Sequence, residues 1–309
     1  MLNKGGQALA LLSFSFFFSV LFTPLSVLLS HRVGAIDVPD GDRKLHARPT
    51  PRLGGFAVFF SIFLAGLLFL EEGSTRAALL SGGALLCVLG ISDDVFSLSP
   101  PLKLFCQAVI SLVPVCFSLY PQTFVLGVFS FSLPPWVCII FSVLWIIMLS
   151  NAYNLVDGAD MLSSSQALVS AAALSLYVPI AWVLFGSVLG FLPYNRRALG
   201  LAPVERMPTR TFLGDTGALF IGYALGVLSL SQSTFSFFWL LFFAVPLYEL
   251  VSSFFRRAVR GKNPFYADRS HLHHRLMDRG FSPALTVFLL FLYALLFSSA
   301  GVLLVELFK

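Results

Sequence analysis

The sequence predicts an all-α polytopic membrane protein with about ten transmembrane helices. Hydrophobic residues make up 57% of the 309-residue chain and charged residues only 11%, and the mean hydropathy is +0.87. These values lie outside the usual range of soluble domains. The apolar runs are continuous and lack the alternation of a membrane β-barrel, so their backbone groups must pair within helices. We expect a single domain over residues 1–309.

Ten apolar segments are candidates for membrane crossings, each of which needs roughly 20 apolar residues. They cover about 8–30, 53–70, 77–91, 102–120, 134–150, 162–177, 178–192, 213–230, 235–255 and 283–307. The first segment is long for a signal peptide and has no small-residue cleavage site before the basic loop, so we predict that it is a helix. The stretch 121–133 alternates enough to predict a short hairpin on the outer face.

Five polar stretches separate these segments and contain 17 of the 20 Lys and Arg residues. The stretches are 31–52, 92–103, 151–162, 193–211 and 256–282. Because two crossings separate each consecutive pair, all five lie on one face, and the positive-inside bias places that face in the cytoplasm. The chain is therefore expected to build one active site on its cytoplasmic face, with both termini on the outer side.

The first polar stretch, from Asp37 to Gly55, is expected to be ordered. Its prolines restrict the backbone, and Gly54-Gly55 allows the next helix to begin close to neighbouring chain. Lys44 and Arg52, with Arg43 and Arg48, could hold an anionic head group. Topology signals and contacts to anionic lipid are an equal alternative for these cations.

Asp93 and Asp94 stand side by side where the third helix is expected to leave the membrane. Two adjacent acids repel each other unless a cation or a metal neutralises them, and Lys103 supplies a cation nearby. The alternative is a capping and turn motif before the helix that begins near Pro100.

Asn151, Asn154, Asp157 and Asp160 recur every three residues directly after the fifth apolar segment. On a helical turn they would share one face and present oxygen ligands of the kind that hard divalent cations take. A polar hairpin between two spans is the alternative, but it accounts less well for four periodic polar residues in apolar sequence.

Asp215 lies at the expected start of the eighth helix, between Gly214 and Gly217. A helix N-terminus offers free N–H groups and a positive dipole end, which suit phosphate. An Asp N-cap explains this motif alone equally well. Together with the other carboxylates, Asp215 indicates a metal held against bound phosphate.

Three of the five histidines, His271, His273 and His274, lie within four residues between Arg269 and Arg275. No Cys is near, and adjacent histidines rarely chelate one tetrahedral zinc ion. A cluster of donors around a phosphate or a sugar hydroxyl fits this pattern better than zinc or unconnected surface histidines.

From about Asp37 to Ser282, the five polar segments resemble in order and content those of the polyprenyl-phosphate N-acetylhexosamine-1-phosphate transferases. This is glycosyltransferase family 4, which includes the WecA and TagO type enzymes and the phospho-MurNAc-pentapeptide translocase. The resemblance implies that the terminal phosphate of a polyprenyl phosphate such as undecaprenyl phosphate attacks the sugar-side phosphorus of a UDP-sugar. The products would be polyprenyl-diphosphate-sugar and UMP, formed with Mg²⁺, or Mn²⁺ as a substitute, in the bacterial cytoplasmic membrane.

The resemblance also implies roles for single residues. Asp215 and Asn154 would be the metal ligands, and Asp93 and Asp94 would orient or deprotonate the lipid phosphate. The implied substrate contacts are Lys44, Arg52, Asn151, Asp157, Arg269, His271, His273 and His274.

The spacing His271-x-His273-His274 resembles the WecA and TagO branch, so the expected donor is UDP-N-acetylglucosamine or a related UDP-N-acetylhexosamine. A UDP-muramoyl-peptide donor is the alternative within the family. The chain departs from the family pattern at Met161, where glycine is usual, at Ala218, where serine is common, and at Glu249, where this branch commonly has Asp.

A membrane transporter of an anionic solute is the alternative of another class. Its ionisable groups should lie near the membrane midplane in broken helices, whereas here they lie at loop edges. We expect no nucleic-acid partner, and the sequence leaves open whether the protein forms a homodimer.

Overall fold

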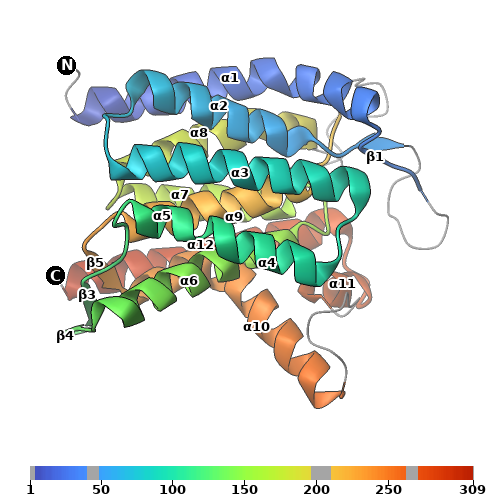
Figure 1. The fold of residues 1–309 in the computed structure, drawn as a ribbon. Coiled ribbons are helices and arrows are strands. Elements are labelled where there is room, and N and C mark those ends of the chain that lie inside the picture. Colours follow the sequence, from blue (N-terminus) through green and yellow to red (C-terminus); the bar gives the residue numbers. More distant parts are fainter. Residues whose placement is uncertain (1–3, 40–48, 196–209, 262–270, 309) are drawn as a thin grey trace.

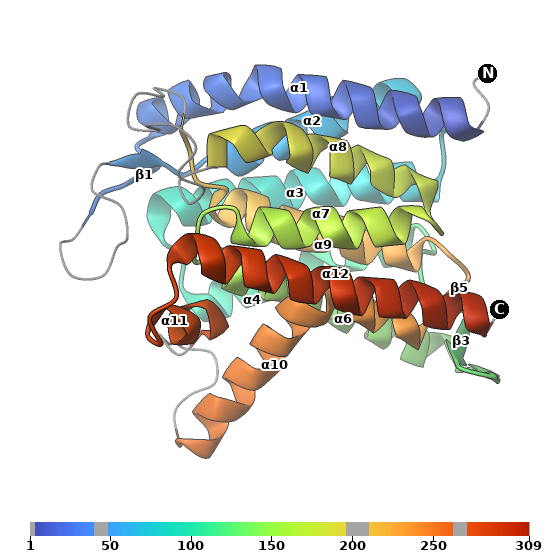
Figure 2. The ribbon, with the colours of Figure 1, turned by 180° about the vertical axis from the view of Figure 1, so that it is seen from behind.

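The computed structural model describes residues 4–39, 49–195, 210–261 and 271–308 (Figure 1). Most helices run side by side in one bundle, and helix α10 leaves it obliquely. Both ends of the chain lie at one end of the bundle, whereas strand β1 and helix α11 lie at the opposite end (Figures 1 and 2). The first and last of the polar stretches, which contain β1 and α11, thus lie at the end of the bundle opposite the two termini, as the alternation of loops predicts.

Within the described residues, five helical segments are long and apolar enough to cross a membrane. They are α1 (Lys4–Val33, of which Gly5–Val33 qualifies), α3 (Ser74–Phe96), α6 (Pro135–Val156), the segment Phe237–Val259 and α12 (Pro283–Leu307). The prediction of an all-α, multi-pass membrane protein is thereby confirmed.

Shorter helices occupy the other predicted crossings. They are α2 (Gly54–Phe69), α4 (Pro100–Ile110) with α5 (Leu112–Cys116), α7 (Leu162–Ser175), α8 (Trp182–Phe191) and α9 (Gly214–Leu230). The total of ten crossings stays a prediction, because the lengths of these helices do not by themselves establish a span.

Two predicted helices are divided or shortened in the structure. The segment 102–120 is divided at Ser111 into α4 and α5, and it ends as a helix at Cys116. Pro114 has no N–H for the carbonyl of Ile110, so the α-helical ladder cannot continue through this point. The segment 235–255 begins with strand β5 (Thr234–Ser236) and the 3-10 helix η4 (Phe237–Phe243), and only Ala244–Val259 forms α10. The third helix, by contrast, is longer than the predicted 77–91.

The predicted hairpin in 121–133 is confirmed. Strands β3 (Thr123–Leu126) and β4 (Phe129–Ser132) pair antiparallel around a two-residue turn that begins at Gly127, whose φ is +60°. Strand β5 joins this sheet parallel to β3, which the sequence pattern did not predict. A second small sheet pairs β1 (Ile36–Asp37) with β2 (Thr50–Pro51). The remaining short elements are η1 (Pro179–Ala181), η2 (Leu192–Asn195) and α11 (Leu272–Met277).

Helix α9 is the centre of the bundle and is buried along nearly its whole length, as expected for a helix that is apolar on all sides. It packs against α2, α3 and α6. A Cβ atom on Gly55 of α2 would lie 2.0 Å from the backbone nitrogen of Gly217, and one on Gly90 would lie 2.3 Å from Cα of Thr216. These glycines therefore let the start of α2 and the end of α3 approach the first turn of α9 directly.

We predict that Gly90→Ala lowers the unfolding midpoint of the detergent-solubilised protein. The added methyl group meets the backbone of Thr216, so α3 and α9 must move apart, which costs about 1–3 kcal/mol. This outweighs the gain of about 1 kcal/mol in helix propensity. Gly73→Ala, at the extended N-cap of the same helix with no atom within 4 Å, is the control. Equal midpoints for both variants would contradict the close approach.

Candidate active site

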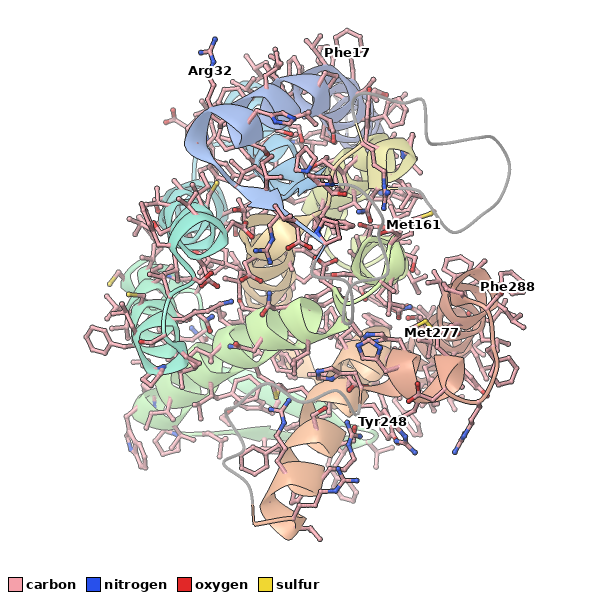
Figure 3. The ribbon with its side chains drawn as sticks, turned by 90° about the vertical axis from the view of Figure 1, so that its right-hand side faces the viewer. Phe17, Arg32, Met161, Tyr248, Met277 and Phe288 are labelled. Atoms are coloured by element: carbon pink, nitrogen blue, oxygen red, sulfur yellow. The ribbon has the colours of Figure 1, made fainter. Side chains whose placement is uncertain are left out.

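The ends of four helices meet at the end of the bundle that carries α11, the end that faces the viewer in Figure 3. Helix α3 supplies Asp93 and Asp94, and the first turn of α4 supplies Lys103. The last turn of α6 supplies Asn154, and the first turn of α9 supplies Asp215. Residues that lie far apart in the sequence are thus brought together as predicted.

The ammonium group of Lys103 lies among three oxygen atoms of this cluster. Its Nζ is 2.5 Å from Asp93 Oδ2, 3.1 Å from Asp215 Oδ2 and 3.4 Å from Asn154 Oδ1. Asn154 Nδ2 in turn donates to Asp215 Oδ1. The side chain of Asp215 is 28% exposed, against 7% for Asp93, so Asp215 is the more accessible of the two carboxylates.

Asp94 caps helix α9 from the neighbouring helix α3. Its carboxylate accepts from the N–H groups of Asp215 and Thr216, both at 3.0 Å, and from the Thr216 hydroxyl at 2.7 Å. These are the second and third residues of α9, whose own N-cap, Leu213, provides no side-chain bond. A carboxylate at this position satisfies free N–H groups and lies at the positive end of the helix dipole. Asp94 therefore fixes the position of Asp215.

Asp93 has two different contacts. Its Oδ1 accepts from the N–H of Leu98 at 2.8 Å, which is the turn role considered for this pair, and its Oδ2 faces Lys103. Neither acid caps α4, whose N-cap is Ser99. Asp93 thus stabilises the turn between α3 and α4 and still presents one oxygen to the cluster.

The polar residues 151–160 do not share one helical face, so that prediction is wrong. Helix α6 ends at Val156, and the chain turns through Asp157, Gly158 and Met161, which has a left-handed φ of +64°. Asp160 pairs instead with Arg210 at 2.8 Å.

Asn151 and Asp157 nevertheless stay next to the cluster. Asn151, one turn before Asn154 on α6, donates to Oε1 of Gln107 on α4. The half-buried carboxyl of Asp157 has a pKa raised well above its usual range, because of burial and then of the nearby charges of Asp215 and Asp94.

The histidine segment packs against the turn after α6. A Cβ atom on Gly158 would lie 2.3 Å from Nε2 of His273, so only glycine allows this contact without rearrangement. The ring of His273 is buried, and neither of its nitrogens has a hydrogen-bond partner in the described part of the chain. Burial, and then the neighbouring His274 and His271, lower its pKa to about 3. Within the described residues, His273 is therefore a neutral ring whose two nitrogens have no hydrogen-bond partner.

His271 and the start of α11 are held by Glu249 of α10. The carboxylate accepts from His271 Nδ1 at 2.8 Å, from the Leu272 N–H at 2.8 Å and from the Ser253 hydroxyl at 3.0 Å. Sequence reasoning named Glu249 only as a departure from a family pattern and gave it no role.

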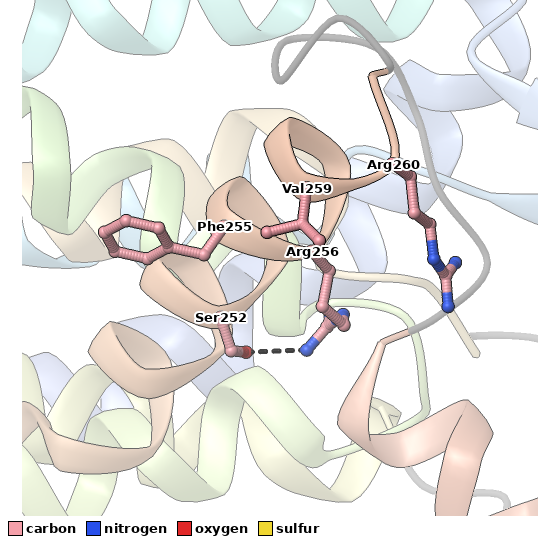
Figure 4. A pocket seen from close by; sticks show the side chains of 5 residues that line it. All are labelled: Ser252, Phe255, Arg256, Val259 and Arg260. Carbon is pink, nitrogen blue, oxygen red and sulfur yellow. Dashed lines mark hydrogen bonds between the residues drawn. The ribbon is translucent and has the colours of Figure 1, made fainter.

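The outer side of α10 has a different character. It bears a pocket lined by Ser252, Phe255, Arg256, Val259 and Arg260 (Figure 4). Phe255 and Val259 are exposed, and the arginines lie at the end of the helix. Apolar side chains beside arginines are typical of a helix that contacts lipid tails and head groups.

The other predicted substrate contacts have separate outcomes. The half-exposed Arg52 lies beside the cluster, with its Nε 3.8 Å from Asp94 Oδ1. Lys44 and Arg269 lie outside the described residues. Sequence reasoning missed Gln107 and Thr216. Gln107 could have been found, because it lies four residues after Lys103 in an apolar segment and so on the same face of a helix.

A comparison with known protein families agrees with this geometry. The family model of glycosyl transferase family 4 matches residues 76–233, which contain the ends of α3 and α6 and the start of α9. The chain belongs to glycosyl transferase family 4. Among curated proteins, it is 31% identical over 306 residues to a "probable undecaprenyl-phosphate N-acetylglucosaminyl 1-phosphate transferase" of Bacillus subtilis, covering 92% of this chain and 81% of that protein.

Two further relatives of family 4 carry the name undecaprenyl-phosphate alpha-N-acetylglucosaminyl 1-phosphate transferase. The protein of Thermotoga maritima is 35% identical, covering 92% of this chain and 86% of its own. The protein of Escherichia coli K12 is 30% identical, and the match covers 93% of this chain and 81% of that protein. The likeness therefore extends over nearly the whole chain and includes the histidine segment.

We predict that the neutral state of His273 makes the protein less stable in acid. In the folded protein the pKa of His273 is about 3, below the value of about 6.5 expected in the unfolded chain. The stability that depends on a neutral His273 is therefore fully present above pH 6.5 and is lost as the pH falls. Between pH 6.5 and 5 the loss is about 2 kcal/mol.

The unfolding midpoint in detergent, measured at pH 7 and pH 5, tests this point. The variant His273→Leu should lose less stability than the wild type over this interval. His31→Leu, at an exposed position in the last turn of α1, is the matched control. The same acid loss in wild type and His273→Leu would show that His273 is not the group responsible.

Proposed function

We propose that this protein transfers N-acetylglucosamine-1-phosphate from a UDP-sugar to undecaprenyl phosphate and releases UMP. The observation that carries the proposal is the meeting of Asp93, Lys103, Asn154 and Asp215 at one end of a bundle of membrane helices. The names of the family 4 relatives support the same reaction. Such a site can receive a soluble nucleotide sugar and a lipid phosphate at the membrane surface.

The donor atoms in the cluster suit a magnesium ion. Mg²⁺ takes oxygen ligands, commonly one or two carboxylates together with substrate phosphates. Asp215 and Asn154 offer such oxygens, and the position of both beside the Lys103 ammonium supports a site where positive charge is favourable. In the part of the chain that the structure describes, no three His, Cys, Asp or Glu side chains form a metal site alone, so the diphosphate would complete the coordination. Mg²⁺ or Mn²⁺ bound there would neutralise charge on the diphosphate.

The lipid phosphate is assigned to the side of the cluster formed by Asp93 and Lys103. Lys103 provides a positive charge for the incoming phosphate, and Oδ2 of Asp93 can accept a proton from it or orient it. The phosphate oxygen then forms a bond to the sugar-side phosphorus of the donor while the bond to UMP breaks. Asp94 contributes by holding Asp215 through the first amides of α9.

The nucleotide sugar is assigned to the side formed by Asn151, Asp157 and the histidines. Helix α11 packs on the turn at Gly158, so both groups border the same space. The spacing of the three histidines favours an N-acetylhexosamine donor over a muramoyl peptide. We further propose that this end of the bundle faces the cytoplasm of a bacterial inner membrane, which the distribution of 17 of the 20 basic residues supports.

The purified protein, with undecaprenyl phosphate, Mg²⁺ and UDP-N-acetylglucosamine, is expected to form a lipid-linked diphosphate sugar and UMP. A chelator should abolish the reaction, and Mn²⁺ should restore it. A panel of UDP-sugars, including UDP-muramoyl pentapeptide, tests the donor. Release of UDP instead of UMP would identify a glycosyltransferase that moves the sugar without its phosphate, and the proposal would be wrong.

Asp215→Asn is expected to lower turnover by about 10²-fold or more, because a neutral amide is a poorer ligand of a hard cation. Asp278→Asn, the same change at an exposed position after α11, is the matched control and should retain turnover. Both variants are compared with wild type for membrane insertion and unfolding midpoint. Near-normal turnover of a correctly inserted Asp215→Asn would remove Asp215 from the metal site.

A further inference from the structure

We propose that Glu249 is a positioning residue that fixes the ring of His271 and the start of α11 for binding of the phosphosugar donor. This inference rests on the proposed function, because it assigns the histidine segment to the donor. It concerns a residue on α10 that lies more than twenty positions before the histidines in the sequence. Its basis is a set of contacts within the described residues.

Glu249 is completely buried, with a relative exposure of 0%. A buried carboxylate is costly unless donors surround it. Oε1 accepts from His271 Nδ1 at 2.8 Å and from the Ser253 hydroxyl at 3.0 Å, while Oε2 accepts from the Leu272 N–H at 2.8 Å. Arg256 Nη2, 3.4 Å from Oε1, adds a positive charge. Both oxygens therefore already accept hydrogen bonds within the protein.

The contact with Glu249 determines which nitrogen of His271 can meet a substrate. An ionised carboxylate only accepts hydrogen bonds, so Nδ1 must carry the proton in this pair. Nε2 is then the ring atom left for other partners. A carboxylate that orients a histidine through the second nitrogen has the same effect in metal sites, where its loss weakens the site without removing the histidine.

Glu249 also fixes the histidines that follow His271. His271 is the N-cap of α11 but makes no capping bond with its side chain, and Glu249 instead accepts from Leu272, the first residue of that helix. Helix α11 has only six residues, so its placement depends on contacts with its neighbours. The buried carboxylate thus sets the position of His273 against Gly158.

The first test is steady-state kinetics of Glu249→Gln, with Glu71→Gln, an exposed glutamate between α2 and α3, as the matched control. We expect the KM for the UDP-sugar to rise about ten- to a hundredfold, the range for loss of a charge-assisted contact, and the KM for the polyprenyl phosphate to stay within twofold. An equal rise in both KM values would indicate a general structural defect and overturn the proposal.

A double-mutant comparison separates positioning from an independent role. If Glu249 acts through His271 and the helix that follows it, the loss in Glu249→Gln combined with His271→Ala should be smaller than the product of the two single losses. Losses that multiply would overturn the proposal. If Glu249→Gln does not reach the membrane, Glu249→Asp replaces it in both measurements, because it keeps the charge but withdraws it by one methylene, and the expected directions are the same.

The second test does not depend on activity. In protein labelled with ¹⁵N-histidine, the ring signals of His271, assigned by their loss in His271→Ala, should show a proton on Nδ1, and Glu249→Gln should change this pattern. An unchanged pattern would overturn the proposal. If the pattern changes as expected but the wild type releases UMP from no UDP-sugar, the contact stands and the proposed transferase reaction is what has failed.

Discussion

The carboxylate of Asp94 joins the end of one helix to the start of another, and the arrangement of the site depends on this contact. Asp94 belongs to α3, but its carboxylate accepts hydrogen bonds from the amides of Asp215 and Thr216 and from the Thr216 hydroxyl, all in the first turn of α9. Glycines at the same crossing let the two backbones approach closely enough for these bonds. Because the side chain has no exposure to water, loss of its charge would leave free amides buried in the bundle. Asp215 is therefore placed by the packing of the bundle and not by a flexible loop.

Glu249 has the same physical role on the other side of the site. Each of these two buried carboxylates accepts hydrogen bonds from the first turn of another helix: Asp94 from two amides of α9, and Glu249 from one amide of α11. Asp94 places the carboxylate of Asp215, and Glu249 places the ring of His271. The site thus contains partly exposed polar groups, such as Asp215 and His271, supported by buried acids, an arrangement that holds groups near a productive geometry before substrate arrives.

The sequence was sufficient to predict a bundle of several membrane helices, the hairpin near Gly127 and the meeting of Asp93, Asp94, Asn154 and Asp215. Apolar length and the alternation of crossings indicate these features. Prediction from the sequence failed where a helix is interrupted or ends earlier than the apolar pattern indicates. Pro114 interrupts a predicted span between α4 and α5. Helix α6 ends at Val156, so residues 157–160 lie in a turn that is followed by the left-handed Met161. The family resemblance expected glycine at this position, and the positive φ explains why glycine would fit there. The roles of Glu249 and Thr216 could not be predicted, because each depends on a contact between helices that are separated in the sequence.

The charges in the described cluster indicate how the two substrates and the metal depend on one another. Four carboxylates, those of Asp93, Asp94, Asp157 and Asp215, lie near only two cations, Lys103 and Arg52. Burial, and then this excess of negative charge, raises the pKa of Asp157. A diphosphate donor would be repelled by such a cluster unless positive charge came with it. In a transferase of the proposed kind, binding of the donor and binding of the divalent cation would therefore strengthen each other by the same factor, since such coupling is reciprocal. In such a transferase, the carboxylates that make the cluster unfavourable for the donor alone would make it selective for the donor together with its metal.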